Sequence, residues 1–284
     1  MKPKFENVQL NEVETSFAVQ NLTLDEFEFN WHYHPEYEIT FIRRGSGTRY
    51  VGDSIENFYD FDLTMIGPNL PHTWVSMKSE KPPLSSTVIQ FKEDFISTWI
   101  KYPEFAELQL LLENCKRGLY FTLSNNNEFS HLIEDLLNQT GIRKIIVFLK
   151  LLYVLSQQNS VVLSSNHYVF IKSEINNKRI NKIYNYVQQN FSKSVSATEG
   201  ASLINLSESA FCHFFKKSTG KTFSDYINEV RISHACNLLL LTDTTISEVA
   251  FSCGFDSLTY FNRVFKSKKH ATPRDLKKRK KDYN

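Results

Sequence analysis

Long hydrophobic runs and closely spaced cysteines are both missing from this chain. No stretch of about 18 uninterrupted apolar residues occurs, so we expect no membrane-spanning helix. The first residues lack a basic segment followed by an apolar core, which argues against secretion. The cysteines Cys115, Cys212, Cys236 and Cys253 include no Cys-x-x-Cys pair. We therefore expect reduced thiols that act as small hydrophobic residues in a cytoplasmic protein.

Catalytic signatures are missing as well. The sequence contains no nucleophile–base constellation and no glycine-rich phosphate loop, so we expect no enzyme and no cofactor. What is present is an ordinary globular composition, with 41% hydrophobic and 23% charged residues, which argues against disorder. At 284 residues the chain is long enough for two ordinary domains.

The net charge of +2 hides an uneven distribution. Residues 1–177 contain 15 Lys and Arg against 22 Asp and Glu, whereas residues 178–284 contain 18 against 9. An acidic first part and a basic second part indicate two domains with different partners, the basic one facing a polyanion. Composition alone leaves a second interpretation open, in which these charges are only solvated surface.

The first hundred residues are rich in aromatic and β-branched side chains in short stretches. Residues 36–42 alternate polar and apolar, as in a half-buried strand, and residues 48–52 can return antiparallel to them. Further short strands are expected at 63–66 and 86–91. This pattern predicts an antiparallel barrel or sandwich in a domain of residues 1–160, with helices from about residue 95.

Residues 142–155 form a helix that is apolar around much of its circumference. A surface helix does not need that much apolar area. Two alternatives stay open: the helix is sandwiched inside the first domain, or it also forms a dimer contact. Polar residues follow, and we interpret residues 161–177 as the linker to a second domain at 178–284.

The second domain contains an internal near-repeat of helical segments. Residues 196–201 match residues 245–250, and both begin with Ser/Thr-x-x-Glu. This capping box satisfies the first backbone N–H groups of a helix. A second helix then carries paired aromatic residues on its inner face, namely Phe211 and Phe215 in the first copy and Phe261 and Phe265 in the second.

The segment between the two helices of each copy has the chemistry of a tight turn. Asn205 and Gly254 are residue types that accept a positive φ, and Ser207 or Asp256 is expected to cap the second helix. A short helix, such a turn and a second helix make a helix-turn-helix unit. The alternative is a plain helical hairpin, but the paired occurrence and the local positive charge favour DNA binding.

The second helix of such a unit lies in the major groove and presents its outer face to base edges. Arg263 can make a bidentate contact to guanine and Asn262 to adenine, whereas Lys217, Lys266 and Lys268 are expected at phosphates. The residues predicted to contact DNA are Ser209, Cys212, His213, Lys216 and Lys217 in the first unit and Leu258, Thr259, Tyr260, Asn262, Arg263 and Lys266 in the second.

Residues 223–241 can form one long helix between the two units. At 1.5 Å per residue it would span roughly 28 Å. That length would hold the reading helices near one turn of DNA apart, about 34 Å. Such a monomer would read an asymmetric site and bend the DNA.

These stretches resemble the DNA-binding domain of the AraC/XylS family of bacterial regulators. The resemblance lies in residues 207–220, 226–235, 246–255, 260–266 and 272–274, within about the last third of the chain. It implies a two-lobed helical fold and promoter binding with control of transcription. The chain departs from the family pattern at His213, where arginine is frequent, so the first unit lacks that arginine for base contacts.

The first domain is similar to the cupin-type sensor domain common in that family. His32-x-His34-x-x-x-Glu38, and later Pro68-x-x-x-His72, have the spacing of the two cupin metal motifs. Three imidazoles and a carboxylate would suit Fe, Mn, Ni or Zn. Three alternatives stay open: a bound metal, a small-molecule pocket, or purely structural histidines. The residues predicted to bind an effector are His32, His34, Glu38, His72 and Tyr50, with Trp31, Tyr37, Arg43 and Trp74 as further candidates.

Together these patterns predict an α+β protein, with an N-terminal antiparallel, cupin-like β-barrel that carries a helical appendage and a C-terminal all-α domain of two helix-turn-helix units. We expect a sequence-specific DNA-binding transcription regulator controlled by a small-molecule effector in the barrel. Its partners would be promoter DNA, the effector, RNA polymerase if it is an activator, and a second copy in a homodimer, with no membrane contact. The alternative function is a metal-dependent cupin enzyme with an appended helical domain.

Overall fold

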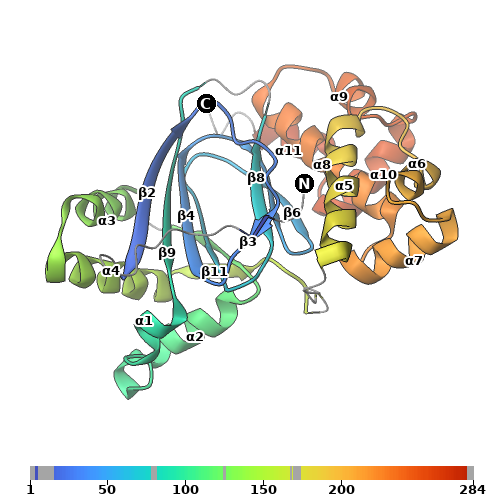
Figure 1. The fold of residues 1–284 in the computed structure, drawn as a ribbon. Helices are drawn as coiled ribbons and strands as arrows, with labels where there is room; N and C mark the ends of the chain where they lie inside the picture. Colours follow the sequence, from blue (N-terminus) through green and yellow to red (C-terminus); the bar gives the residue numbers. More distant parts are fainter. Residues whose placement is uncertain are drawn as a thin grey trace.

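The computed structural model describes residues 4–5, 16–77, 82–123, 126–166, 168 and 174–279. In Figure 1 a β-rich N-terminal half with peripheral helices lies beside a C-terminal half made of helices. The predicted α+β class is confirmed. No helix within these ranges is both long and apolar enough to cross a lipid bilayer.

Two sheets make up the N-terminal half. The first sheet has the strand order β1 (Lys4–Phe5), β3 (His32–Tyr33), β8 (His72–Ser76), β5 (Gly47–Val51) and β6 (Ser54–Phe58). The second has the order β11 (Asn159–Val162), β10 (Leu119–Thr122), β7 (Asp62–Ile66), β4 (Tyr37–Arg44), β9 (Leu84–Phe91) and β2 (Phe17–Leu24). Neighbours are antiparallel except β1 and β3. No strand ladder joins the two sheets over the described ranges, so the predicted barrel is an open one.

Strand β4 is buried on both faces, unlike the half-buried strand predicted for residues 36–42. Its apolar residues Tyr37, Ile39 and Phe41 pack in one hydrophobic core with the peripheral helices. The residues between them, Glu38 and Thr40, point to the interior between the sheets, where they line a pocket. Polar and apolar side chains still alternate along β4, but its polar face is covered by the first sheet and is not exposed to solvent.

The helices predicted from about residue 95 are present and cover the outer face of the second sheet (Figure 1). They are α1 (Glu93–Ser97), the 3-10 turn η1 (Pro103–Phe105), α2 (Ala106–Cys115), α3 (Asn126–Asn138) and α4 (Gly141–Ser156). Helix α4 buries Phe148, Leu151, Leu152 and Leu155. Packing inside the first domain, the first of the two alternatives for this helix, therefore accounts for the apolar residues on one face of α4. Its opposite face leaves Ile142, Ile146 and Tyr153 exposed by 74%, 59% and 61%.

The C-terminal half is a chain of helices with well-defined caps. They are α5 (Glu174–Asn190), α6 (Ala197–Leu203), α7 (Glu208–Thr219), α8 (Phe223–Leu241), α9 (Ile246–Ser252), α10 (Leu258–Lys269) and α11 (Pro273–Arg279). Both predicted capping boxes form, at the starts of α6 and α9. Asn205 and Gly254 have positive φ, 56° and 84°, as the turn requires. Ser207 caps α7, but Ser257 caps α10, so the prediction of Asp256 was one residue early.

Helix α8 connects two hydrophobic cores. Phe223, Tyr226 and Val230 pack with α5, α6 and α7 in the core of the first unit. From Ile232 onward the helix packs with α9 and α10 in the core of the second unit. The predicted single rod of 19 residues is therefore present, and nearly all of its sides are covered.

The first sheet lies between the interior of the N-terminal half and the helical half. Trp31 and Tyr50 of the β-rich half belong to the same hydrophobic core as Tyr184 of α5. The hydroxyls of Thr48 and Ser233 lie 2.8 Å apart in a buried hydrogen bond between β5 and α8. Strand β11 and helix α5 both extend into the predicted linker 161–177. The division into domains at these residues stays a prediction.

Candidate nucleic-acid interface and effector pocket

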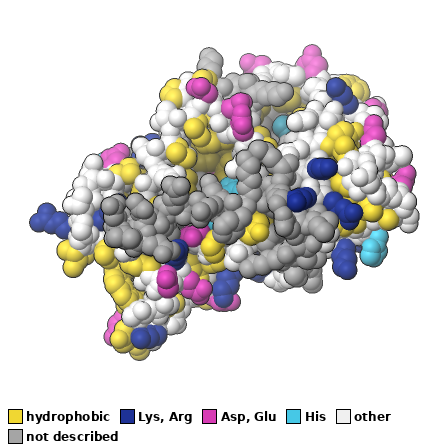
Figure 2. Space-filling model, in the orientation of Figure 1, with side chains coloured by type: hydrophobic (Ala, Val, Ile, Leu, Met, Phe, Trp, Pro, Cys, Tyr) yellow, Lys and Arg dark blue, Asp and Glu magenta, His cyan; other side chains and the backbone are white. Residues whose placement is uncertain are grey.

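The outer face of α7, the second helix of the first unit, is exposed as predicted. Phe211 and Phe215 are buried against α5, α6 and α8, because they recur every four residues on one side of the helix. The opposite side therefore points outward, and the side chains exposed on it are Ser209, Cys212, His213, Lys216 and Lys217. Figure 2 shows Lys and Arg side chains over the helical half on the face in view.

The outer face of α10, in the second unit, is also exposed. Phe261 and Phe265 are buried, whereas Leu258, Thr259, Tyr260, Asn262, Arg263 and Lys266 are exposed. The Arg263 guanidinium lies 5.2 Å from the centre of the Tyr260 ring. The Tyr260 hydroxyl accepts a hydrogen bond of 2.9 Å from Asn228 of α8. Tyr260 is thus anchored and holds Arg263 on the open face of the helix.

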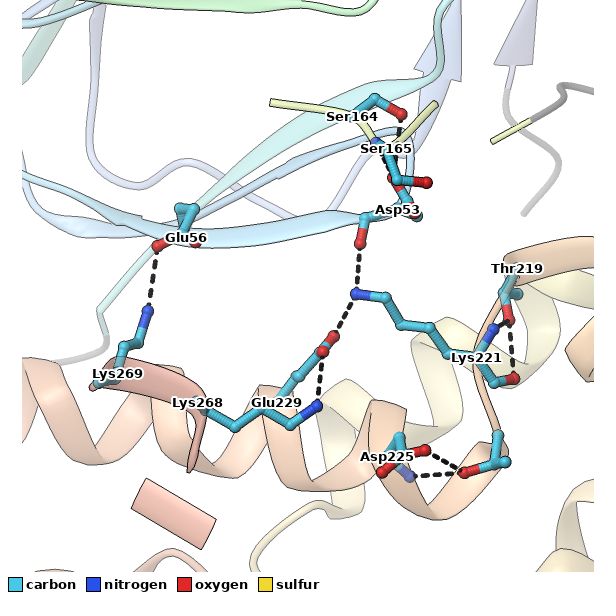
Figure 3. Close-up of polar contacts among 11 residues, drawn as sticks. Asp53, Glu56, Ser164, Ser165, Thr219, Lys221, Asp225, Glu229, Lys268 and Lys269 are labelled. Atoms are coloured by element: carbon cyan, nitrogen blue, oxygen red, sulfur yellow. Dashed lines mark hydrogen bonds and ion pairs between the residues drawn. The ribbon is translucent and has the colours of Figure 1, made fainter. Parts of the chain in front are cut away.

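The lysines at the end of α10 point away from that face. Lys268 pairs with Glu229 of α8 at 2.9 Å, and Lys269 pairs with Glu56 of β6 at 3.0 Å (Figure 3). Figure 3 also shows Lys221, before α8, donating to Glu229 and to the backbone oxygen of Asp53. A phosphate contact by Lys268, as predicted, would require the pair with Glu229 to open.

Four side chains of the N-terminal half meet in one cluster. His32 lies on β3, His34 follows it, Glu38 lies on β4 and His72 on β8. One ligand atom from each lies within 4.8 Å of all the others. His34 Nε2 lies 3.0 Å from one carboxylate oxygen of Glu38, and His72 Nε2 lies 3.6 Å from the other. The sequence motifs predicted this grouping, and the strand pairing of His32 with His72 produces it.

Backbone contacts fix the rings of two of these histidines. His32 Nδ1 and His72 Nδ1 each lie 2.7 Å from a backbone carbonyl oxygen, of Asn30 and Leu70 respectively. A carbonyl only accepts, so both Nδ1 atoms carry the proton. Nε2 is then the ring atom directed to the cluster, and on His72 it is buried without a hydrogen-bond partner. A backbone acceptor that orients an imidazole in this way is typical of metal ligands.

Burial and neighbouring charges shift the pKa values of His32 and Glu38. Burial lowers the pKa of the His32 imidazole to about 3, and the neighbouring His72 lowers it further. Burial raises the pKa of Glu38, but His72 and His34 outweigh it and hold that pKa well below its ordinary value. A neutral imidazole and an ionised carboxylate are the forms that coordinate a metal, so His32 and Glu38 suit a divalent transition-metal ion.

The cluster lies at the wall of a pocket of about 420 Å³ between the two sheets. His32 and Glu38 line it, and Trp74 from β8 lies among the apolar wall residues. The remaining apolar lining comes from Leu22, Leu24, Phe27, Ile42 and Val88. A volume of this size is typical of a small-molecule site. Polar side chains such as Gln20, Thr40 and Ser86 line it together with the apolar ones.

Sequence reasoning missed several polar residues of this site, of which Gln90 contacts the cluster directly, and it included Tyr50, which lies elsewhere. Gln90 of β9 donates a hydrogen bond of 2.9 Å to Glu38, and it lines the pocket. Its position opposite Glu38 follows from the β4–β9 register, which no local pattern reveals. Tyr50 does not line the pocket. It points to the helical half, where its hydroxyl accepts a hydrogen bond from Gln188, which argues against its predicted effector role.

Comparisons with known proteins match both halves of the chain. Residues 14–143 match the model of an AraC-like ligand binding domain, and residues 201–279 match the model of a helix-turn-helix domain. An uncharacterized HTH-type transcriptional regulator of Staphylococcus aureus (strain MSSA476) is 33% identical over 106 residues, which are 37% of this chain and 14% of that protein. The activator RhaS of Klebsiella pneumoniae (strain 342) is 27% identical over 132 residues, 46% of this chain and 44% of RhaS.

Solved structures match more weakly. Fatty-acid-bound ToxT of Vibrio cholerae strain SCE256 is 19% identical and covers 93% of this chain and 95% of its own, with a TM-score of 0.38. A regulator of Chromobacterium violaceum with an AraC-type DNA-binding domain is 23% identical over 36% of this chain and 92% of its own, with a TM-score of 0.35. The curated relatives extend well beyond the matched region, because the chain spans 14% of the first and 44% of the second.

Proposed function

The chain belongs to the AraC family of regulators, and from this premise we propose that it is a sequence-specific DNA-binding transcription regulator whose N-terminal pocket binds a small-molecule effector. The observation that carries this proposal is the pair of helix-turn-helix units, each with its aromatic side buried and its outer side exposed. Exposed basic and amide side chains on such a face are the groups that read base edges and bind phosphates.

We assign base reading mainly to the second unit. Arg263 and Asn262 are both exposed on α10 and are suited to guanine and adenine, each contact contributing about 1–3 kcal/mol of discrimination. Lys216, Lys217 and Lys266 would contact phosphates and add affinity that falls with salt. Ser209, Cys212 and His213 of α7 would make weaker or water-mediated contacts, as would Leu258, Thr259 and Tyr260 around the anchored start of α10.

We assign effector binding to the pocket between the sheets. His32 and Glu38 line it directly, while His34 and His72 complete the polar cluster at its wall. The apolar side chains of the lining would enclose the body of the effector, and the polar ones, including the cluster, would bind its polar groups. The sheet that carries His32 and His72 also contacts α5 and α8, so effector binding has a direct structural route to the helical half.

Genome-wide mapping of bound DNA in the host bacterium tests the proposal. We expect discrete promoter sites, and the genes beside them would indicate the chemistry of the effector. Arg263→Ala should weaken binding at sites with the preferred base more than at sites without it. If Arg263→Ala leaves binding unchanged at every promoter, the assignment of base reading to α10 is wrong.

We further propose a homodimer through the exposed face of α4. Ile142, Ile146 and Tyr153 lie on one side of that helix, and the partly buried Leu149 lies between them at helical spacing. An exposed apolar stripe of this kind marks a protein contact. RNA polymerase would be a further partner if the protein activates transcription, and the cytoplasm would be its compartment.

A metal-dependent enzyme is the second candidate, because His32, His34, Glu38 and His72 fit a metal ion. The relatives named above are transcription regulators, which favours the first candidate. Metal analysis of the purified chain separates the two. Near one metal ion per chain, lost in His34→Ala, together with turnover of a small molecule would favour the enzyme. A metal without turnover would make the ion part of the effector site.

A further inference from the structure

The two helix-turn-helix units have separate hydrophobic cores, and α8 passes from one to the other within two residues. Val230 is buried in the first core and Ile232 in the second, with Arg231 between them. Among the residues that the structure describes, none belongs to both cores. Apolar packing therefore fixes the inside of each unit. The orientation of one unit to the other depends on α8, on polar contacts across this boundary and on the contacts that both units make with the first sheet.

Arg231 makes such contacts with both units at once. Its Nε and Nη2 atoms donate hydrogen bonds of 2.8 Å to the backbone oxygens of Phe191 and Lys193, which follow α5 in the first unit. Its guanidinium also lies 5.6 Å from the centre of the Phe255 ring, in the turn of the second unit. The planar guanidinium can satisfy two acceptors and a ring face together, which a lysine ammonium cannot.

The backbones of the two units touch beside Arg231. A Cβ atom at Gly254, in the turn of the second unit, would lie 2.6 Å from the backbone oxygen of Phe191. The Phe191 ring stacks on His234 of α8, with ring centres 4.0 Å apart and planes 13° apart. The contact held by Arg231 is thus a close-packed one, and sliding of one unit over the other would break it.

Glu229 holds the units together on another side of α8. Its carboxylate accepts from Lys221, in the turn between α7 and α8, at 2.5 Å and from Lys268 of α10 at 2.9 Å (Figure 3). Glu229, Lys221 and Lys268 are all partly buried, with side-chain exposures of 17%, 23% and 28%. Water therefore screens these pairs less than it screens a fully exposed pair.

We propose that Arg231, supported by Glu229, fixes the distance and rotation between the two reading helices, so that the protein demands one spacing between the halves of its DNA site. This inference rests on the proposed function. One extra base pair moves the second half-site by about 3.4 Å along the duplex and about 35° around it. A pair of units that cannot turn relative to each other cannot follow that displacement, and the base contacts of one unit are lost.

The experiment selects sites from a random-sequence duplex library with three versions of the full chain. They are the wild type, Arg231→Met and the control Arg179→Met. Arg179 of α5 is the matched control, because its guanidinium lies over the Phe214 ring at 5.9 Å, inside the first unit. We expect the wild type and Arg179→Met to enrich two half-motifs at one spacing. Arg231→Met should enrich the same half-motifs at several spacings.

Binding affinities measured on duplexes of defined spacing give the size of the expected effect. Insertion of one base pair between the selected halves should weaken wild-type binding at least about tenfold, the discrimination carried by one base contact. In Arg231→Met the same insertion should change affinity by less than about threefold, because a loosened second unit can follow the duplex.

If Arg231→Met still selects a single spacing and loses as much affinity on insertion of one base pair as the wild type does, this inference is wrong and the proposed function stands. If the wild type enriches no motif at all, the proposed function falls and this inference with it. If circular dichroism shows that Arg231→Met does not fold, Arg231→Lys and Glu229→Gln replace it with the same readouts. A single spacing retained by both of these variants would also overturn the inference.

Discussion

Replacing Gly254 by alanine should destabilise the C-terminal half by about 2–5 kcal/mol. Gly254 has a φ of 84°, a conformation that costs a residue with a Cβ atom roughly 1–2 kcal/mol. The new Cβ would also lie 2.6 Å from the Phe191 oxygen and 3.0 Å from Cα of Ser192. These are backbone atoms that cannot rotate away, so overpacking should add about 1–3 kcal/mol.

Gly220→Ala separates the two contributions. Gly220 also has a positive φ, 75°, but a Cβ atom there would meet nothing within 4 Å. This variant should lose only the backbone contribution, about 1–2 kcal/mol. The free energy of unfolding, from urea titrations followed by far-UV circular dichroism, gives both losses. Equal losses in the two variants would refute the claim that the two units touch at Gly254.

Three further predictions concern the pocket, the DNA face and α4. The pKa of His32 is about 3 in the folded chain and about 6.5 in the unfolded chain. Between these pH values the unfolded state binds one proton more than the folded state. The free energy of unfolding should therefore fall by about 1.4 kcal/mol for each pH unit below pH 6.5. His32→Gln should reduce that slope, and an unchanged slope would contradict a neutral, buried His32 imidazole. Lys216→Ala should reduce the slope of log affinity against log salt by about 0.9, and an unchanged slope would remove Lys216 from the phosphate contacts. Ile146→Lys should shift any dimer to monomer in sedimentation, since a charge would replace a side chain that is 59% exposed in the single chain.

The helical half was largely predictable because its signals are local. A capping box needs only residues three apart, so the starts of α6 and α9 followed from Ser196 and Thr245. The turn residues Asn205 and Gly254 were predicted from their tolerance of positive φ alone. The error at Asp256 has the same origin: Asp256 and Ser257 are adjacent residues of capping type, and the choice between them depends on how the turn packs.

The pocket was predictable only in part. The spacing of His32, His34, Glu38 and His72 indicated a common site, and the strand pairing brings them together. Tyr50 was also assigned to this site, but it lies on the other side of the first sheet. Alternation along a strand shows which residues share a face but not which layer each face meets. The register that places Gln90 beside Glu38 joins strands about fifty residues apart, and nothing near either residue in the sequence records it.

What the sequence determined by itself was therefore the set of local units: two capped helix pairs, the rod between them, short alternating strands and the charge of each half. These depend on contacts within a few residues, whose energies are set by residue type and spacing. The tertiary structure alone decided that the first sheet lies between the pocket and the helices. It also decided that Lys268 and Lys269 face carboxylates and that Arg231 contacts both units. Each of these is a contact between distant segments, and its geometry depends on how whole elements pack.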